Sequence, residues 1–163
     1  MRRLRPQARP AVATAPGESV LAWAEARDGT VVAGTRDAIY VGDVRLPWEK
    51  VEAADWDRDE DRLRISEVGT WGVERVEHTL TFDNAGRLLE LVRERVTASV
   101  VLQRHVPVAG RRGLRVIARR APRGNQPLAW FYEYDEGIDP TDPEVHAVAE
   151  RALATAREEL GQA

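Results

Sequence analysis

The stretch DAIYVGDVRLPWEKVEAADWDRDEDRLRISEVGTWGVERVEHTLTFD, residues 37–83, alternates short apolar runs with turn residues. It holds three of the chain's five tryptophans, Trp48, Trp56 and Trp71. The polar run at 57–61 separates two segments in which polar and apolar side chains alternate, and such alternation is typical of half-buried strands. This stretch therefore predicts a meander of short antiparallel strands, and by itself it indicates no chemistry.

The region around this stretch extends the same pattern in both directions. Asp28-Gly29 is a hairpin signal between two further apolar runs. In the last strand, alternation predicts that Val76, His78, Leu80 and Phe82 share an inward face. The predicted strands are residues 19–26, 30–34, 38–41, 47–56, 62–68 and 75–82.

After residue 82 the hydrophobic pattern changes from the period of a strand to that of a helix. Asp83 or Asn84 is a suitable N-cap, and the predicted helix runs to about residue 98. Its apolar side chains recur at helical spacing, which predicts that one face packs against the sheet. That face consists of Leu88, Leu91, Val92 and Val96.

Several short antiparallel strands followed by one amphipathic helix resemble the pleckstrin-homology-like (PH-like) barrel. The matching pieces are DGTVVAGTRDAIYVG, the strand opening LPWEKV and the helix AGRLLELVRERV, and the resemblance covers residues 19–98. It implies a curled sheet plugged at one end by the helix, and a function as a binding platform. The family has seven strands where six are counted here, so residues 43–46 or the loop around Trp71 would supply the seventh.

The remainder of the chain predicts three more strands and a helix. The strands are expected at 99–106, 113–120 and 128–135. Asp142 followed by Pro143 is a strong helix start, and Val145, Ala149, Ala152, Ala156 and Leu160 form its apolar stripe. The expected fold is α+β: a flexible basic tail at 1–18, a curled antiparallel PH-like barrel capped by a helix at 19–98, and a three-strand-plus-helix extension at 99–163 packed on it.

Composition sets broad limits on the class of protein. The net charge is -3, and no cysteine is present to form a disulfide or a thiolate metal site. No apolar run approaches the length of a membrane span, and the basic start lacks the apolar core of a secretory signal. We therefore expect a cytoplasmic protein. Arginine is used almost to the exclusion of lysine, which indicates a bacterium with a GC-rich genome.

Charge is segregated along the second half of the chain. Residues 93–123 carry nine arginines and one acid, whereas residues 133–159 carry nine acids and two arginines. One interpretation is a polyanion-binding hairpin at 111–123 with neighbouring aromatic side chains for base stacking. The candidates are Arg111, Arg112, Arg115, Arg119, Arg120 and Arg123, with Trp130 and Tyr132 for stacking. The alternative is that antiparallel pairing places these arginines beside Glu133 and Asp135 and the aromatics in the core.

Motifs for catalysis, metals or cofactors are not evident. His78, His105 and His146 have no metal-ligand spacing, and the acidic run at 57–61 lacks the pattern of an EF-hand, so we expect no metal, calcium included, and no cofactor. The leading hypothesis is a non-catalytic binding or interaction module with an unknown protein or small ligand and unknown oligomeric state. Polyanion binding is the first alternative, and a small enzyme using scattered residues such as His78, His105 and Asp135 is the second.

Overall fold

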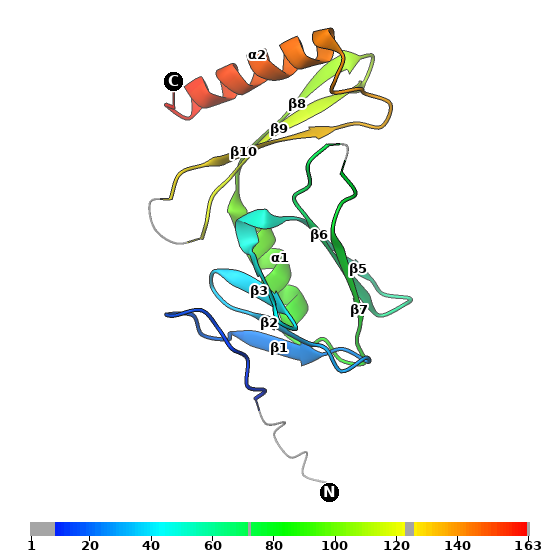
Figure 1. Ribbon diagram of the computed structural model, residues 1–163, viewed down its shortest axis with the longest axis vertical. Coiled ribbons are helices and arrows are strands. Elements are labelled where there is room, and N and C mark those ends of the chain that lie inside the picture. The colour runs from blue at the N-terminus through cyan, green and yellow to red at the C-terminus, as the bar shows by residue number, and fades with distance from the viewer. Residues whose placement is uncertain (1–8, 72, 123–125, 163) are drawn as a thin grey trace, which may run out of the picture.

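The computed structural model describes residues 9–71, 73–122 and 126–162. In them the chain forms three antiparallel sheets and two α-helices (Figure 1), which confirms the expected α+β class. The strands are β1 Ala22–Glu25, β2 Val31–Gly34, β3 Ala38–Val41, β4 Val44–Pro47, β5 Val51–Asp57, β6 Arg62–Glu67, β7 Glu77–Thr81, β8 Val100–Ala109, β9 Arg112–Arg119 and β10 Ala129–Tyr134; the helices are α1 Leu88–Ser99 and α2 Pro143–Glu159.

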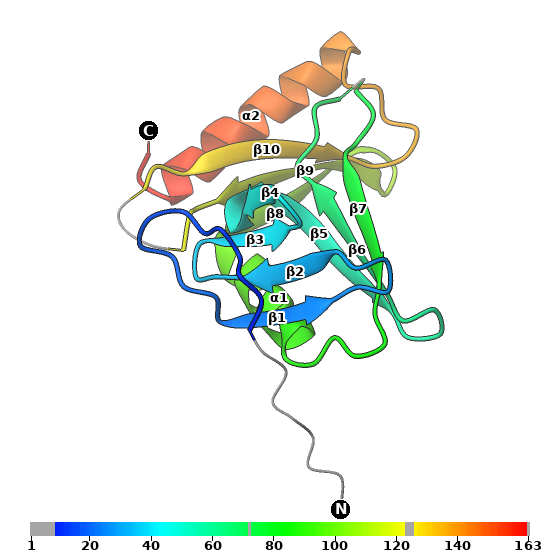
Figure 2. The same ribbon diagram turned by 60° about the horizontal axis from the view of Figure 1, so that its bottom comes forward.

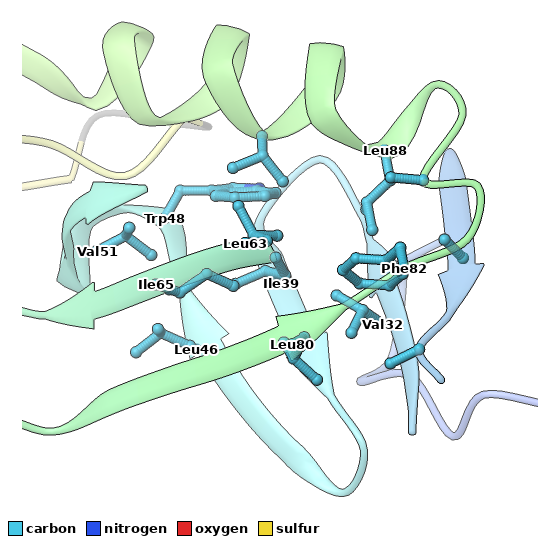
Figure 3. Close-up of a cluster of buried hydrophobic side chains, with 14 residues drawn as sticks. Val32, Ile39, Leu46, Trp48, Val51, Leu63, Ile65, Leu80, Phe82 and Leu88 are labelled. Atoms are coloured by element: carbon cyan, nitrogen blue, oxygen red, sulfur yellow. The ribbon is translucent and has the colours of Figure 1, made fainter. Parts of the chain in front are cut away.

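The first seven strands form two meanders, β1-β2-β3-β4 and β5-β6-β7, joined by the 3-10 turn η1 Trp48–Lys50. Apolar side chains from both sheets and from α1 meet in one buried cluster (Figure 3). Leu88 projects into it from α1, and Trp48 lies on the side of the cluster that faces this helix. The sheet is curled, and no closed barrel forms in the described residues. Leu80 and Phe82 belong to this core, as alternation in the sequence predicted, and Leu63 and Ile65 of the neighbouring strand β6 belong to it as well.

Two strand predictions need correction. Residues 44–47 form β4, as the first of the two alternatives for a seventh strand predicted, whereas the predicted strand 47–56 is divided because η1 turns the chain at Trp48. The loop around Trp71 contributes no strand among its described residues. Val76 is exposed and precedes β7. His78 is half-buried, and its Nε2 lies 2.8 Å from Glu67 Oε2.

Helix α1 begins three residues later than an N-cap at Asn84 predicts, and four later than one at Asp83. Gly86 has a φ of +52°, a left-handed conformation that interrupts a helix, and Asn84 accepts a hydrogen bond from its backbone N–H at 3.0 Å. Asn84 therefore closes a turn before the helix, and the N-cap position falls to Arg87, which makes no side-chain cap. Of the predicted face, Leu88 and Val92 are buried. Leu91 and Val96 are partly buried.

The third sheet has the order β10-β9-β8, and α2 packs across one face of it (Figure 2). Leu114, Val116 and Ala118 of β9 meet Val145 and other side chains of α2 in a second core. The start of α2 is confirmed, since Asp142 accepts from the backbone N–H of Glu144 at 2.8 Å and Pro143 opens the helix. Strand β8 extends to Ala109, three residues beyond the predicted end of this strand at residue 106.

Residues 9–18 belong to the segment that was expected to be a flexible tail, yet they contact the outer face of the first sheet. Val12 packs on a small cluster that contains Tyr40, and the backbone N–H of Ala15 donates to the Tyr40 hydroxyl at 2.9 Å. The side chain of Glu18 is almost fully buried, and its carboxylate accepts hydrogen bonds from Tyr40 and Arg45. Burial raises the pKa of Glu18, but these two donors and the Arg45 charge outweigh it, so the pKa lies below its usual value. Residues 1–8 lie outside the described part.

Neither helix is long and apolar enough to cross a membrane, as judged over the residues that the structure describes.

Candidate binding cleft between two sheets

The arginines of the 111–123 hairpin do not form a single surface. Arg119 is 4% exposed, and its guanidinium donates to Ser99 Oγ at 2.9 Å and to the Glu52 carbonyl oxygen at 3.0 Å. It therefore joins β9 to the end of α1 and to β5, inside the protein. Burial lowers the pKa of Arg119, although the charges of Glu52 and Glu133 oppose that shift.

The other arginines are divided between paired and exposed positions. Arg115 lies opposite Glu133 in the β9–β10 register, and its Nη1 is 3.6 Å from Glu133 and 3.8 Å from Asp135, as cross-strand pairing predicted. Arg111 and Arg112 are exposed at the hairpin tip. Arg120 is half-buried, and Arg123 lies outside the described residues.

The stacking candidates lie on the other face of this sheet. In the register, Trp130 is opposite Ala118 and Tyr132 is opposite Val116, whose side chains belong to the core under α2. Trp130 packs against that core and lies 5.9 Å from the Arg157 guanidinium. Because successive side chains of a strand point to opposite faces, Trp130 and Tyr132 are separated from Arg115 and Arg119 by the sheet.

The residues named for a possible enzyme site are only partly brought together. His105 and Asp135 are in contact, with 2.9 Å between Nε2 and Oδ2, whereas His78 pairs with Glu67 on the second sheet. Asp135 Oδ2 also accepts from the backbone N–H of Gly113, and hydrogen bonds from His105 and Gly113 hold the pKa of Asp135 below its usual value. This contact ties β8 to the end of β10 across β9.

The acidic loop 57–61 uses its carboxylates internally. Asp57 Oδ1 accepts from the backbone N–H groups of Asp59 and Glu60 at 3.0 and 3.2 Å, and its Oδ2 is 3.4 Å from Arg62. Asp61 lies 3.6 Å from Arg27. Over the described part of the chain, no cluster of three or more acidic, histidine or cysteine side chains is placed to hold a metal ion.

We therefore expect millimolar calcium to leave the melting temperature unchanged relative to matched ionic strength in sodium chloride. A cation bound only by the folded state would raise the melting temperature. A rise of several degrees that is abolished by Asp57→Asn, and not by the control Asp43→Asn, would contradict this expectation.

A cleft of about 380 Å³ opens between the second and third sheets. One wall consists of residues 68–71, 73 and 75 of the loop between β6 and β7, and this loop rises toward β9 and β10 (Figures 1 and 2). The opposite wall consists of residues 131–134 of β10 together with Ile117 of β9. Glu52, Arg75 and Arg119 also line it.

Apolar side chains are exposed on the loop wall. Trp71 is 58% exposed and Val73 is 67% exposed, and both line the cleft. Across from them, the ring of Phe131 has the Lys50 ammonium 5.6 Å from its centre. The cleft therefore presents aromatic surface from two elements about sixty residues apart in the chain.

The charged groups of the cleft are mixed. Arg75 Nη2 lies 3.2 Å from Glu52 Oε1. Burial raises the pKa of Glu52, the Arg75 charge opposes this shift, and the nearby Glu133 carboxylate adds to it. Glu77 accepts from Ser66 Oγ at 3.4 Å and forms no ion pair with the described residues.

Sequence reasoning did not identify this cleft. Trp71 was placed in a loop, but alternation cannot show that a loop side chain stays exposed and faces a strand sixty residues away. The only sequence signal is the pair Gly69 and Gly72 around a tryptophan, because a large aromatic residue in a glycine-rich loop has no neighbours that would cover it locally.

Comparison with known proteins finds no similarity: no protein-family model, no curated protein and no solved structure matches the chain.

Proposed function

We propose that this chain is a non-catalytic binding module whose ligand is a segment of another protein, held in the cleft between β10 and the described residues of the β6–β7 loop, 68–71 and 73–76. The observation that carries this proposal is the exposure of Trp71 and Val73 opposite the aromatic strand β10. Exposed apolar side chains that are clustered at a concave site are typical of interaction surfaces, and aromatic residues are enriched there.

The PH-like resemblance belongs to the same proposal. The first seven strands are grouped four and three and are followed by α1, which agrees with the strand number of that family and supports a binding platform. The bacterial source and the cytoplasmic location remain hypotheses from composition. Fold alone does not determine function, so the proposal depends on the cleft.

Selection from a displayed library of random peptides tests the proposal. We expect the native chain to enrich peptides whose binding weakens at least tenfold on Trp71→Ala with Val73→Ser. Leu21→Ser is the matched control, because Leu21 is 55% exposed and does not line the cleft. Peptides that bind the double variant as tightly as the native chain would contradict the proposal, and so would a selection that enriches none.

Polyanion binding is the second candidate, and the exposure of Arg111 and Arg112 at the hairpin tip favours it. Arg115 and Arg119 are engaged inside the protein, and the net charge of -3 opposes the approach of a polyanion. Two exposed arginines give a weak, salt-sensitive contact at most, since affinity for nucleic acid depends on the number of phosphates neutralised.

We therefore expect no retention on heparin above modest salt and no change in elution when Arg111 and Arg112 are both replaced with alanine. The control is Arg87→Ala with Arg93→Ala, two exposed arginines elsewhere. Firm retention that is abolished by the hairpin pair alone would make polyanion binding the leading function.

A further inference from the structure

Strand β10 is the edge of its sheet, and its hydrogen-bonding groups alternate between the partner strand and open space. The backbone N–H of Asp135 donates to the Gly113 carbonyl oxygen at 2.9 Å, and these two residues lie opposite each other when the register is continued by one position. In an antiparallel ladder every second residue bonds to the partner strand. Phe131 and Glu133 therefore bond to β9, and the N–H and C=O groups of Tyr132 and Tyr134 point away from it.

The two edges of this sheet differ in how well they would accept another strand. Strand β8 contains Pro107 and has register shifts at Val100/Leu102 and Pro107/Ala109, which are features that discourage pairing at an edge. Strand β10 pairs with β9 without a shift and contains neither proline nor lysine. Its sequence AWFYEY has high β propensity, so β10 is the unprotected edge of the sheet.

The open edge of β10 borders the cleft. Four consecutive residues, 131–134, line the cleft. Successive side chains of a strand point to opposite faces of the sheet, so four consecutive residues can line one space only where the backbone edge of the strand borders it. Trp71 and Val73 of the loop stand on the opposite side. A strand added at the usual spacing of about 4.8 Å from β10 would place alternate side chains against these two residues.

Charge in the cleft favours a basic side chain in the added strand. Glu52, Glu77 and Glu133 line the cleft together with Arg75 and Arg119, but the Arg119 guanidinium is bonded to Ser99 and to the Glu52 carbonyl. Glu77 accepts from Ser66 and has no ion pair with the described residues, and the Glu133 carboxylate raises the pKa of Glu52 even though Arg115 Nη1 lies 3.6 Å from Glu133 Oε1. A lysine or arginine beside these carboxylates would reduce their mutual repulsion.

We propose that the ligand of the cleft is an extended peptide segment that adds to β10 as a fourth strand of the sheet, with an apolar side chain on Trp71 and Val73 and a lysine or arginine two residues away beside Glu133. This inference rests on the proposed function and specifies its mode of binding. The backbone bonds supply affinity without regard to sequence, and the two cleft-facing side chains supply specificity.

Amide hydrogen exchange followed by NMR tests the mode with a peptide taken from the library selection. In the free chain the amides of Tyr132 and Tyr134 should exchange rapidly and those of Phe131 and Glu133 slowly. With peptide bound, we expect the first pair to slow at least tenfold. Methylating the peptide backbone nitrogens one at a time should abolish binding at every second position only, since half of its amides face β10.

Glu133→Gln tests the charge, with Glu150→Gln on α2 as control. We expect at least fivefold weaker binding of a lysine-containing peptide in the first variant only. If Trp71-dependent peptides bind while the Tyr132 and Tyr134 amides stay unprotected, strand addition is overturned and the cleft remains the binding site. If Trp71-dependent peptides bind and Glu133→Gln does not weaken their binding, the inference that the ligand carries a basic side chain beside Glu133 is overturned. If the selection yields no Trp71-dependent peptide, the proposed function and this mode both fail.

Discussion

Replacing Trp48 with alanine is expected to lower the free energy of unfolding by about 3–5 kcal/mol through lost packing alone. Trp48 is fully buried between the two meanders and α1 (Figure 3). Its indole N–H also donates to the carbonyl oxygen of Thr35 at 2.9 Å, and Thr35 is fully buried as well. A loss of this size is a large part of the stability of an ordinary domain, about 5–15 kcal/mol.

Two further tryptophan variants separate the contributions. Trp48→Phe keeps much of the packing but removes the indole N–H, so the buried Thr35 carbonyl oxygen loses its donor. We expect this to lower the free energy of unfolding by about 1–3 kcal/mol. Trp71→Ala is the control, because Trp71 is exposed and its removal should change stability by no more than about 0.5 kcal/mol. Urea unfolding followed by circular dichroism measures all three. Equal losses for Trp48→Ala and Trp71→Ala would contradict the assigned core.

These tryptophans show what local sequence can determine. Trp48, Trp56 and Trp71 lie within one stretch of alternating sequence, yet the first is fully buried, the second partly buried and the third exposed. Alternation indicates which face of a strand a residue occupies, and it carries no information on what covers that face. The start of α2, in contrast, was predictable, because the Asp142 cap and Pro143 act within one turn of the helix and need no distant partner.

In the candidate site, too, contacts between neighbouring strands were predictable from the sequence, and contacts between distant segments were not. The Arg115–Glu133 pair follows from antiparallel register, which adjacent strands and a short connection make predictable. Arg119 was expected beside the same acids, but the residue opposite it is Ala129, and its guanidinium instead reaches Glu52, which is 67 residues away in the chain. The cleft depends on that packing of two sheets against each other, and no periodicity in the sequence encodes it.

A substitution near the tip of the β8–β9 hairpin, Gly113→Ala, is expected to have the second large effect on stability. An alanine Cβ at Gly113 would lie 1.9 Å from the Val106 carbonyl oxygen and 2.7 Å from the Pro107 Cα. Both are backbone atoms of the partner strand, next to the register shift at Pro107/Ala109, so no side-chain rotation relieves the clash. The strands must separate, and the hydrogen bonds that link Gly113 to Asp135 would be lost with them.

We therefore expect Gly113→Ala to cost about 3 kcal/mol or more, at the upper end for inserting a methyl group into a packed site, because here the obstacle is backbone. Gly69→Ala is the matched control, since a Cβ there meets only ordinary contacts with the Arg75 side chain and the backbone φ is not left-handed. Urea unfolding gives the two free energies. In Gly113→Ala the amides of Phe131 and Glu133 should also lose protection from exchange, because β10 is held by β9 alone. A Gly113→Ala protein as stable as Gly69→Ala would contradict this expectation and show that the hairpin relaxes around the added methyl group.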